Sequence, residues 1–282
     1  MKIKPVTLNG ISYRWPARPV VVVCIDGSDP AYIEQGVKDG IIPNIERFMK
    51  AGFSAIADGT VPSFTCPNNM SIVTGSPPAV HGISGNFYLE PETRKAVMMT
   101  GPELLRSSTV LAEFSKRGAK IVSITSKDKL RQQLQKGVDI AAGNISFSAQ
   151  YADRCTLAEN GIENALELTG MPQPDMYSAE LSLFVLEAGI RLLEQNRPDI
   201  LYLSLTDYES FSKPTKICPP GCFPSRRICA TPPSTIRAPI ARRRASFCAI
   251  PPSERSESWT TQPRSASSRA QRTIPSSSRR RV

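Results

Sequence analysis

Two carboxylates stand where the sequence predicts the ends of buried strands. Asp26 follows the aliphatic run at residues 19–25, and Asp207 follows the run at residues 200–205 after a single threonine. In parallel sheets of α/β proteins, ligands bind at the carboxyl ends of the strands. An aspartate in such a position can also cap the next helix, so Asp26 has either a chemical or a capping role. Together the two aspartates indicate a site at one edge of a sheet.

A hydroxyl group is predicted at a third place suited to phosphate chemistry. Thr65 stands immediately before Cys66 and Pro67, where a helix is predicted to begin. A hydroxyl at a helix N-terminus faces unpaired backbone N–H groups and the positive end of the helix dipole. Both stabilise an alkoxide and an incoming phosphoryl group. A threonine there can equally be the N-cap residue, and one side chain can have both roles.

A threonine hydroxyl needs activation before it can attack phosphorus. The chain has one histidine, His81, and therefore offers no histidine–aspartate relay. Coordination to a divalent metal is the remaining route, because a metal lowers the pKa of a bound hydroxyl. Asp26, Thr65 and Asp207 would then form half of a two-metal site for phosphoryl transfer.

Strands and helices are predicted to alternate along residues 1–207, which favours an α/β fold with a parallel sheet and helices on both faces. The expected strands are residues 19–25, 54–57, 120–124 and 200–205. One expected helix begins at residues 28–30. The other expected helices span residues 43–50, 109–116, 127–135, 156–168 and 179–195. The continuous β-branched run at residues 19–25 predicts a strand covered on both faces. Residues 143–178 are less regular, and we interpret them as an excursion from the sheet, such as part of a cap.

Three stretches together resemble a known family. They are VVVVCIDGSDPAYIEQ from residue 20, IPNIERFMKAGF from residue 42 and VPSFTCPNNMSIVTGSPPAVHGISGNFY from residue 61. The sequence resembles the alkaline phosphatase superfamily in its phosphodiesterase and nucleotide pyrophosphatase-like branch, and within that branch the phosphonoacetate hydrolases. The resemblance covers about residues 15–208.

The resemblance implies an alkaline phosphatase-like core with two Zn²⁺ ions at the strand ends. It implies hydrolysis of the carbon–phosphorus bond of phosphonoacetate to acetate and phosphate. Asp26, Thr65 and Asp207 would bind metal, and Thr65 would also be the nucleophile. Asn86 would hold a phosphonate oxygen.

Two lysines complete the substrate site that the resemblance implies. Lys127 and Lys129 would bind the substrate carboxylate, where a fixed ammonium stabilises the enolate that forms when the carbon–phosphorus bond breaks. Lysines at this spacing after a strand can also be merely solvated, and both interpretations stay open. We interpret His81 as structural.

The ligands expected after Asp207 are missing from the sequence. In the family, this aspartate would open an Asp-x-x-x-His pair, followed by an Asp-His pair and a further histidine. Phe211 stands at the first of these histidine positions, and residues 208–282 contain no histidine or aspartate. Zinc would lack nitrogen donors, so we expect this polypeptide to have little or no activity.

The composition changes abruptly at the same point. Residues 1–207 carry 20 Lys+Arg against 22 Asp+Glu, whereas residues 208–282 carry 15 against 3 and no leucine. A segment of this kind cannot bury enough apolar surface to fold. We therefore predict a catalytic core at residues 1–207 and a disordered tail rich in Arg, Ser and Pro at residues 208–282. We hypothesise that the tail is translated out of frame, which sequencing the gene past codon 208 would test.

Other functions remain open at this level. The nearest enzyme alternative is a phosphodiesterase or nucleotide pyrophosphatase. From other classes, the chain could be a catalytically dead remnant, or a protein that binds nucleic acid through its Arg/Ser-rich arm. We expect a small-molecule phosphonate as the partner, a homodimer as one oligomeric state, and no membrane partner. No apolar run reaches membrane-spanning length and the first residues lack a signal peptide pattern, so the cytoplasm is the expected location.

Overall fold

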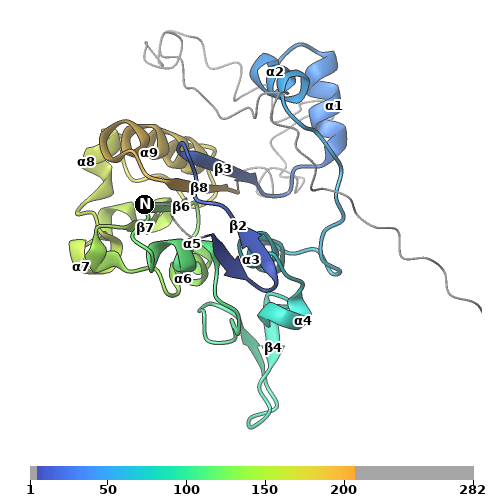
Figure 1. Ribbon diagram of the computed structural model, residues 1–282, viewed down its shortest axis with the longest axis vertical. Helices are drawn as coiled ribbons and strands as arrows, with labels where there is room; N and C mark the ends of the chain where they lie inside the picture. Colours follow the sequence, from blue (N-terminus) through green and yellow to red (C-terminus); the bar gives the residue numbers. More distant parts are fainter. Residues whose placement is uncertain (1–4, 207–282) are drawn as a thin grey trace, which may run out of the picture. The chain divides into compact units, whose positions relative to one another are not determined.

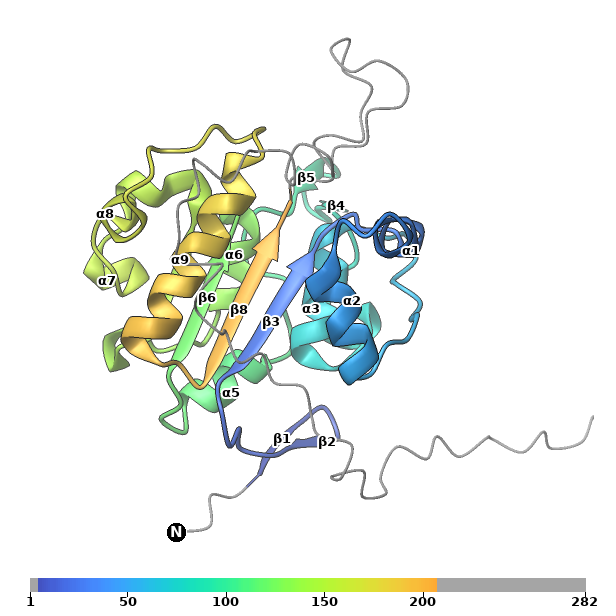
Figure 2. The same cartoon turned by 90° about the horizontal axis from the view of Figure 1, so that it is seen from above.

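A four-stranded parallel sheet organises the protein. The structure, a computed structural model, describes residues 5–206. Its main sheet has the strand order β3-β8-β6-β7, drawn in Figures 1 and 2. The strands are β3 (Val20–Ile25), β8 (Ile200–Leu205), β6 (Ile121–Thr125) and β7 (Ile145–Ser148). The predicted α/β class with a parallel sheet is confirmed.

The register of β8 aligns the strand ends. It pairs in parallel with β3 from Val20↔Ile200 to Ile25↔Leu205 and with β6 from Ile121↔Ile200 onward. Because all of these strands run in the same direction, their carboxyl ends meet at one edge of the sheet. The residues that follow β3, β6 and β8 are therefore brought together there.

Helices cover both faces of the sheet, as predicted. Alternate side chains of β8 enter two separate cores, because successive side chains of a strand point to opposite faces. Leu201, Leu203 and Leu205 pack with α9 (Glu180–Asn196), whereas Ile200 and Tyr202 share the other core. That second core is formed with α3 (Thr65–Thr74), α5 (Val110–Ser115) and α6 (Asp128–Gln135). Figure 1 shows α9 on one side of the sheet and α3, α5 and α6 on the other.

Local sequence signals explain where several helices begin and end. The Asp29 side chain accepts a hydrogen bond from the Ala31 N–H at the start of α1 (Pro30–Lys38). Thr109 caps α5 in the same way through the Ala112 N–H. Gly52 closes α2 (Pro43–Ala51). The helices predicted to begin at residues 28–30 and to span residues 43–50 and 109–116 are confirmed, the last with Thr109 as its cap.

Short elements complete the part of the chain that the structure describes. They are β1 (Val6–Leu8), β2 (Ile11–Tyr13), β4 (Phe87–Leu89), β5 (Ala96–Met98), α4 (Pro78–His81), α7 (Leu157–Asn160), α8 (Ala165–Thr169) and the 3-10 turns Ile140–Ala142 and Ala149–Arg154. β1 pairs with β2, and β4 pairs with β5, each as an antiparallel ribbon.

Residues 143–178 differ from the prediction in two ways. Their first part forms β7, which pairs with β6, so the interpretation of the whole segment as an excursion from the sheet is wrong. The strand was missed because two of its residues are serines, which interrupt the hydrophobic pattern. Ser146 is nevertheless buried and accepts a hydrogen bond from Ser123. The helix predicted at residues 156–168 is two short helices, because Gly161 and Asn164 adopt positive φ angles between them. A role of the segment as a cap stays a prediction.

The side of the sheet at β3 also departs from expectation. Residues 54–57 form no strand, because no described strand pairs with them, and β3 is partly exposed instead of covered on both faces. In Figure 2, α1 and α2 lie on the side of β3 away from β8. The helices of the described residues 5–206 are all too short or too polar to span a lipid bilayer. The predictions for Asp207 and for residues 208–282 lie outside the described residues.

Candidate active site

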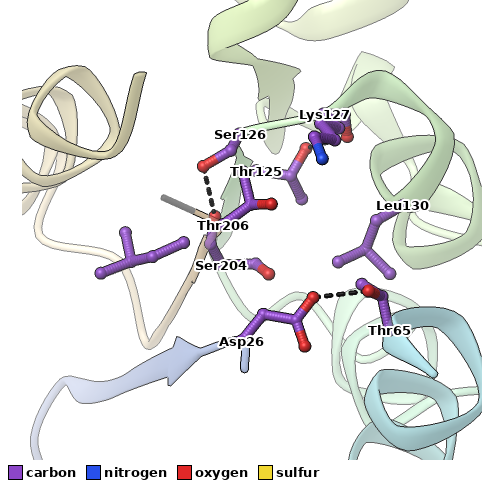
Figure 3. A pocket seen from close by; sticks show the side chains of 9 residues that line it. Asp26, Thr65, Thr125, Ser126, Lys127, Leu130, Ser204 and Thr206 are labelled. Carbon is purple, nitrogen blue, oxygen red and sulfur yellow. Dashed lines mark hydrogen bonds between the residues drawn. The ribbon is translucent and has the colours of Figure 1, made fainter. Parts of the chain in front are cut away.

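Asp26 and Thr65 meet at the carboxyl edge of the sheet. Asp26 directly follows β3, and Thr65 is the first residue of α3, 39 positions later. The Thr65 hydroxyl donates a hydrogen bond of 2.5 Å to the Asp26 carboxylate, shown as a dashed line in Figure 3. The carboxylate therefore holds the hydroxyl hydrogen and leaves the lone pairs of Oγ1 directed elsewhere.

Thr65 is a first-turn residue and not the helix cap. The N-cap of α3 is Phe64, which makes no side-chain cap hydrogen bond, so the alternative interpretation of Thr65 as the N-cap is wrong. Its hydroxyl nevertheless lies at the helix N-terminus, where the dipole of a ten-residue helix favours negative charge. Its position at the helix N-terminus suits an oxygen that develops negative charge, and the carboxylate can accept the hydrogen that the oxygen loses.

A small cavity of about 40 Å³ opens beside this pair. Its lining comes mainly from the ends of β6 and β8 and combines hydroxyl-bearing side chains with Lys127 and the apolar Leu130 and Leu205. The lining residues drawn in Figure 3 include Thr125, Ser126, Ser204 and Thr206. A water needs about 10–15 Å³ by this measure, so the cavity has room for an ion with a few waters.

The three residues proposed for substrate binding lie in two places. Lys127 lines the cavity with Asp26 and Thr65, and its ammonium lies 5.9 Å from the centre of the Tyr177 ring. Lys129 donates a 3.1 Å hydrogen bond to Asn86, which precedes β4. The structure thus pairs Lys129 with Asn86 and places Lys127 in the lining of the cavity that Asp26 and Thr65 also line. Their roles as ligands of a substrate stay predictions.

Asp128, which lies between the two lysines, is held in place by hydrogen bonds from neighbouring side chains. Burial alone would raise the pKa of Asp128, but hydrogen bonds from Arg131 and Gln132 hold it below its usual value. The Arg131 guanidinium contacts the carboxylate at 2.5 Å, and Ser148 donates a further hydrogen bond. This charged network fixes the start of α6, and with it the backbone that carries Lys127 and Lys129.

Sequence reasoning missed a buried connection behind the nucleophile. The Tyr202 hydroxyl donates a 2.7 Å hydrogen bond to Asn69 Oδ1, and the Asn69 amide donates to the backbone carbonyl of Thr65 at 3.0 Å. Burial raises the pKa of Tyr202, so the phenol stays protonated and keeps donating. The available signal was a tyrosine inside an aliphatic strand, since a buried phenol requires a partner.

His81 has the structural role predicted for it. It is fully buried, with Nδ1 accepting a 3.1 Å hydrogen bond from the Ile83 N–H. Nε2 therefore carries the hydrogen and donates to Ser71 at 3.0 Å. The ring therefore links Ser71 of α3 to the turn at Gly82, which has a positive φ angle.

The described residues do not by themselves form a complete metal centre. Asp26 and Thr65 supply one carboxylate and one hydroxyl, and Asp207 lies beyond the last described residue. Among residues 5–206, no three side chains of His, Cys, Asp or Glu gather in one place. Because zinc takes four ligands and prefers nitrogen and sulfur donors, these residues do not fill the coordination shell of zinc.

A family match coincides with the sheet and this site. Residues 20–207 match the sequence model of the type I phosphodiesterase / nucleotide pyrophosphatase family. The chain belongs to this family. The match begins with the first residue of β3 and includes every residue proposed for the site.

Solved structures and a curated relative are similar to this family member. The chain is 47% identical to the phosphonoacetate hydrolase of Sinorhizobium meliloti in complex with phosphonoformate, with a TM-score of 0.71, over 74% of this chain and 50% of that one. For the complex with phosphonoacetate, the values are 44% identity, a TM-score of 0.74, and 81% and 54% coverage. An uncharacterized pyrophosphatase/phosphodiesterase of Schizosaccharomyces pombe is 32% identical over 160 residues, which are 55% of this chain and 31% of the relative. The chain thus spans about half the length of the solved structures and less of the yeast protein.

Proposed function

We propose that this chain carries the nucleophile half of a metal-dependent hydrolase that cleaves the carbon–phosphorus bond of phosphonoacetate. The observation that carries the proposal is the hydrogen bond between Thr65 and Asp26 at the N-terminus of α3. The similarity of 44% to 47% to phosphonoacetate hydrolases supports the choice of substrate.

The nucleophile of the proposed reaction is Thr65 Oγ1. It attacks phosphorus as its hydrogen passes to the Asp26 carboxylate, and the carbon–phosphorus bond breaks with its electron pair on the acetate fragment. That fragment takes up a proton to give acetate, and water then hydrolyses the phosphothreonine to phosphate. The positive end of α3 favours the charge that develops on the phosphoryl oxygens.

The substrate carboxylate would lie at the lysines that follow β6. Lys127 already lines the cavity, and Lys129 is paired with Asn86. An ammonium fixed at this carboxylate stabilises the enolate more than the ground state, which lowers the barrier. The two lysines therefore select a phosphonate with a carboxylate one carbon away.

We further propose that the complete site of the family holds two zinc ions, with Asp26, Thr65 and Asp207 among their ligands. The described donors alone do not fill the coordination shell of zinc. For the same reason we propose that the 282-residue chain alone has little activity. Phe211 and a tail without histidine support this expectation.

Substrate binding can be tested without turnover. We expect phosphonoacetate to bind the purified chain, measured by calorimetry, and Lys127→Ala or Lys129→Ala to weaken it by about tenfold, as for loss of a charged hydrogen bond. Lys120→Ala is the matched control, because this exposed lysine precedes β6 at the opposite end of the strand. Equal affinity in all four proteins would overturn the assignment of the lysines.

Phosphate release tests the nucleophile and the substrate class. With zinc added, we expect little release from phosphonoacetate and none from the Thr65→Ala variant. Release that survives Thr65→Ala would exclude Thr65 as the nucleophile, and vigorous release by the chain alone would overturn its impairment. The yeast relative favours a second candidate, a phosphodiesterase, and faster cleavage of a nitrophenyl phosphodiester than of phosphonoacetate would select it.

A further inference from the structure

The start of α3 is not held by a helix cap. Among the described residues, its N-cap Phe64 makes no side-chain cap hydrogen bond, and the proline at position 67 has no N–H group. The Thr65 hydroxyl is committed to Asp26. A helix N-terminus that binds an anion keeps its N–H groups for that ligand. The support for the residue proposed to attack phosphorus must therefore come from elsewhere.

Two adjacent asparagines support this end of the helix. The Asn68 amide donates a 3.0 Å hydrogen bond to the backbone carbonyl of Phe64, four residues earlier. The Asn69 amide donates to that of Thr65 with the same spacing and distance. Asn68 also accepts a 2.9 Å hydrogen bond from the Thr60 N–H in the preceding loop. Asparagine is unfavourable inside a helix, because its side chain competes for backbone groups. Two in succession indicate that these bonds are needed.

Asn69 connects the helix to the centre of the sheet. It is 1% exposed, and its Oδ1 accepts the 2.7 Å hydrogen bond from the Tyr202 hydroxyl. Tyr202 is equally buried, and in β8 it lies between Val22 of β3 and Ser123 of β6. Strands on both sides hold its backbone, so the phenol is a fixed point relative to the sheet. The same sheet carries Asp26 at the end of β3.

Thr65 is therefore held to the sheet at two points. Its backbone carbonyl accepts from Asn69, which Tyr202 orients from β8. Its hydroxyl donates to Asp26, which follows β3. A threonine in a helix has two accessible χ1 rotamers. The rotamer that reaches Asp26 is favoured as long as the first turn of α3 keeps its place against the sheet.

We propose that Tyr202 and Asn69 are positioning residues, which hold Thr65 in the rotamer that directs its hydroxyl at Asp26. Of the described residues, neither Tyr202 nor Asn69 is among those that line the cavity beside Thr65, so they act through Thr65. Positioning matters for attack on phosphorus, because a displacement of about 1 Å can lower a rate about a hundredfold. The inference deepens the proposed function and rests on Thr65 as the nucleophile, but the position of Thr65 can be measured without any reaction.

NMR of labelled threonine tests the positioning. The probe is the pair of three-bond couplings that join the Thr65 methyl carbon to its backbone nitrogen and carbonyl carbon, which separate one χ1 rotamer from an average. We expect one rotamer in the full 282-residue chain and averaging over two in Tyr202→Phe. We also expect the Asn68 amide to exchange about tenfold faster in Tyr202→Phe, as for the loss of one hydrogen bond. The amide of Val73, in the last turn of α3, should change less than about twofold.

A tyrosine at the other end of α3 provides the matched control. The Tyr13 hydroxyl lies beside Gly75, the C-cap residue of this helix, and the Tyr13 ring packs against the same core as Tyr202. Tyr13→Phe removes the same atom, and we expect it to leave the Thr65 couplings and the Asn68 exchange unchanged. Averaging of Thr65 in Tyr13→Phe as well would overturn the inference, because loss of any phenol near α3 would then have the same effect.

A paired substitution separates positioning from stability. In Tyr202→Phe, the buried Oδ1 of Asn69 loses its donor, which destabilises the chain. Asn69→Leu has nearly the same shape, and together with Tyr202→Phe it removes both partners, so that neither polar atom is left unsatisfied. We expect the double variant to regain at least part of the urea midpoint that Tyr202→Phe loses. Thr65 should nevertheless stay averaged over two rotamers.

Each other outcome overturns the inference. A single Thr65 rotamer in Tyr202→Phe would show that Asp26 and the helix position the threonine unaided, and averaging in the unsubstituted chain would show that nothing holds it. A single rotamer in the double variant would reduce the connection to a contribution to stability. Should Tyr202→Phe fail to fold by circular dichroism, the double variant carries the comparison. Absence of phosphate release, with Thr65 couplings that respond as expected, would count against the proposed function alone.

Discussion

β3 and β8 are neighbouring strands of the same length with nearly the same kind of sequence, and they have opposite environments. Val23 is 40% exposed, while its register partner Leu203 is 4% exposed. β8 has a strand on each side, α9 on one face and α3 on the other, whereas β3 has a described partner on one side only. Burial is therefore a property of what surrounds a strand and cannot be read from its own residues.

The difference separates the described chain into a well-packed part and an under-packed part. The packed part, from β6 to β8 with its helices, contains the lysines and the buried tyrosine. The under-packed part, from β3 to residue 64, contains Asp26 and leads to Thr65. The proposed site lies at the junction of these two parts.

Truncation of register partners gives the largest expected contrast. Leu203→Ala leaves a cavity in the core beneath α9, and we expect it to lower the free energy of unfolding by about 2–5 kcal/mol. Val23→Ala should lower it by less than about 1 kcal/mol, because the valine is already partly in water. Urea denaturation followed by circular dichroism measures both. Similar losses in the two variants would mean that β3 is covered in solution.

Two glycines offer a smaller contrast at matched distances. A Cβ on Gly189 of α9 would lie 2.8 Å from Leu203 Cδ1, and one on Gly36 of α1 would lie 2.8 Å from Ile42 Cδ1. Leu203 is enclosed by the core, whereas Ile42 is half-buried and its terminal methyl can turn away. We expect Gly189→Ala to be less stable than Gly36→Ala by about 1–3 kcal/mol, with the helix propensity gain equal in both. Equal urea midpoints for the two variants would show that the surroundings of α9 accommodate the added methyl group as easily as those of α1.

The smallest expected effect concerns the pH dependence of stability and the buried His81. Burial first, and then the charge of Arg106, lower the pKa of His81 below its usual 6.5. Just below pH 6.5, His81 is therefore protonated in the unfolded chain but still neutral in the folded chain. The free energy of unfolding falls as the pH drops through 6.5, and it levels off below the pKa of His81 in the folded chain. Urea midpoints between pH 7.5 and 5.5 measure this slope.

The contribution of His81 to this pH dependence can be measured separately, because the chain has no other histidine. His81→Gln should be less stable at every pH in this range, and its slope between pH 7.5 and 5.5 should disappear. A slope that persists in His81→Gln would assign the effect to another group.

The fold was predictable wherever one signal dominated a stretch. The aliphatic runs of β3 and β8 and the helix start at residues 28–30 marked their elements, because hydrophobic periodicity and orphan N–H groups are local requirements. β7 escaped because half of its residues are serines, whose hydroxyls are satisfied only by a strand that pairs across from them. Residues 54–57 were wrongly predicted as a strand, because a short apolar run does not indicate whether another strand lies beside it to pair with.

The candidate site was predictable in its residues and not in its contacts. Asp26 and Thr65 could be named from a strand end and a helix start, and the structure joins them by a hydrogen bond. Lys127 and Lys129 followed from resemblance alone, yet one lines the cavity and the other bonds Asn86. The Tyr202–Asn69 connection spans 133 positions, so no local pattern reveals it.

The sequence by itself determined the class of fold, the family, the candidate nucleophile and the abrupt change in composition after residue 207. These depend on residue types and short spacings, which are fixed along the chain. Only the tertiary structure decided that β3 is an edge, that β7 belongs to the sheet, and that a buried phenol supports the residue proposed to attack phosphorus. Those features depend on which distant segments share a boundary, and burial and hydrogen-bond satisfaction exist only once the segments have met.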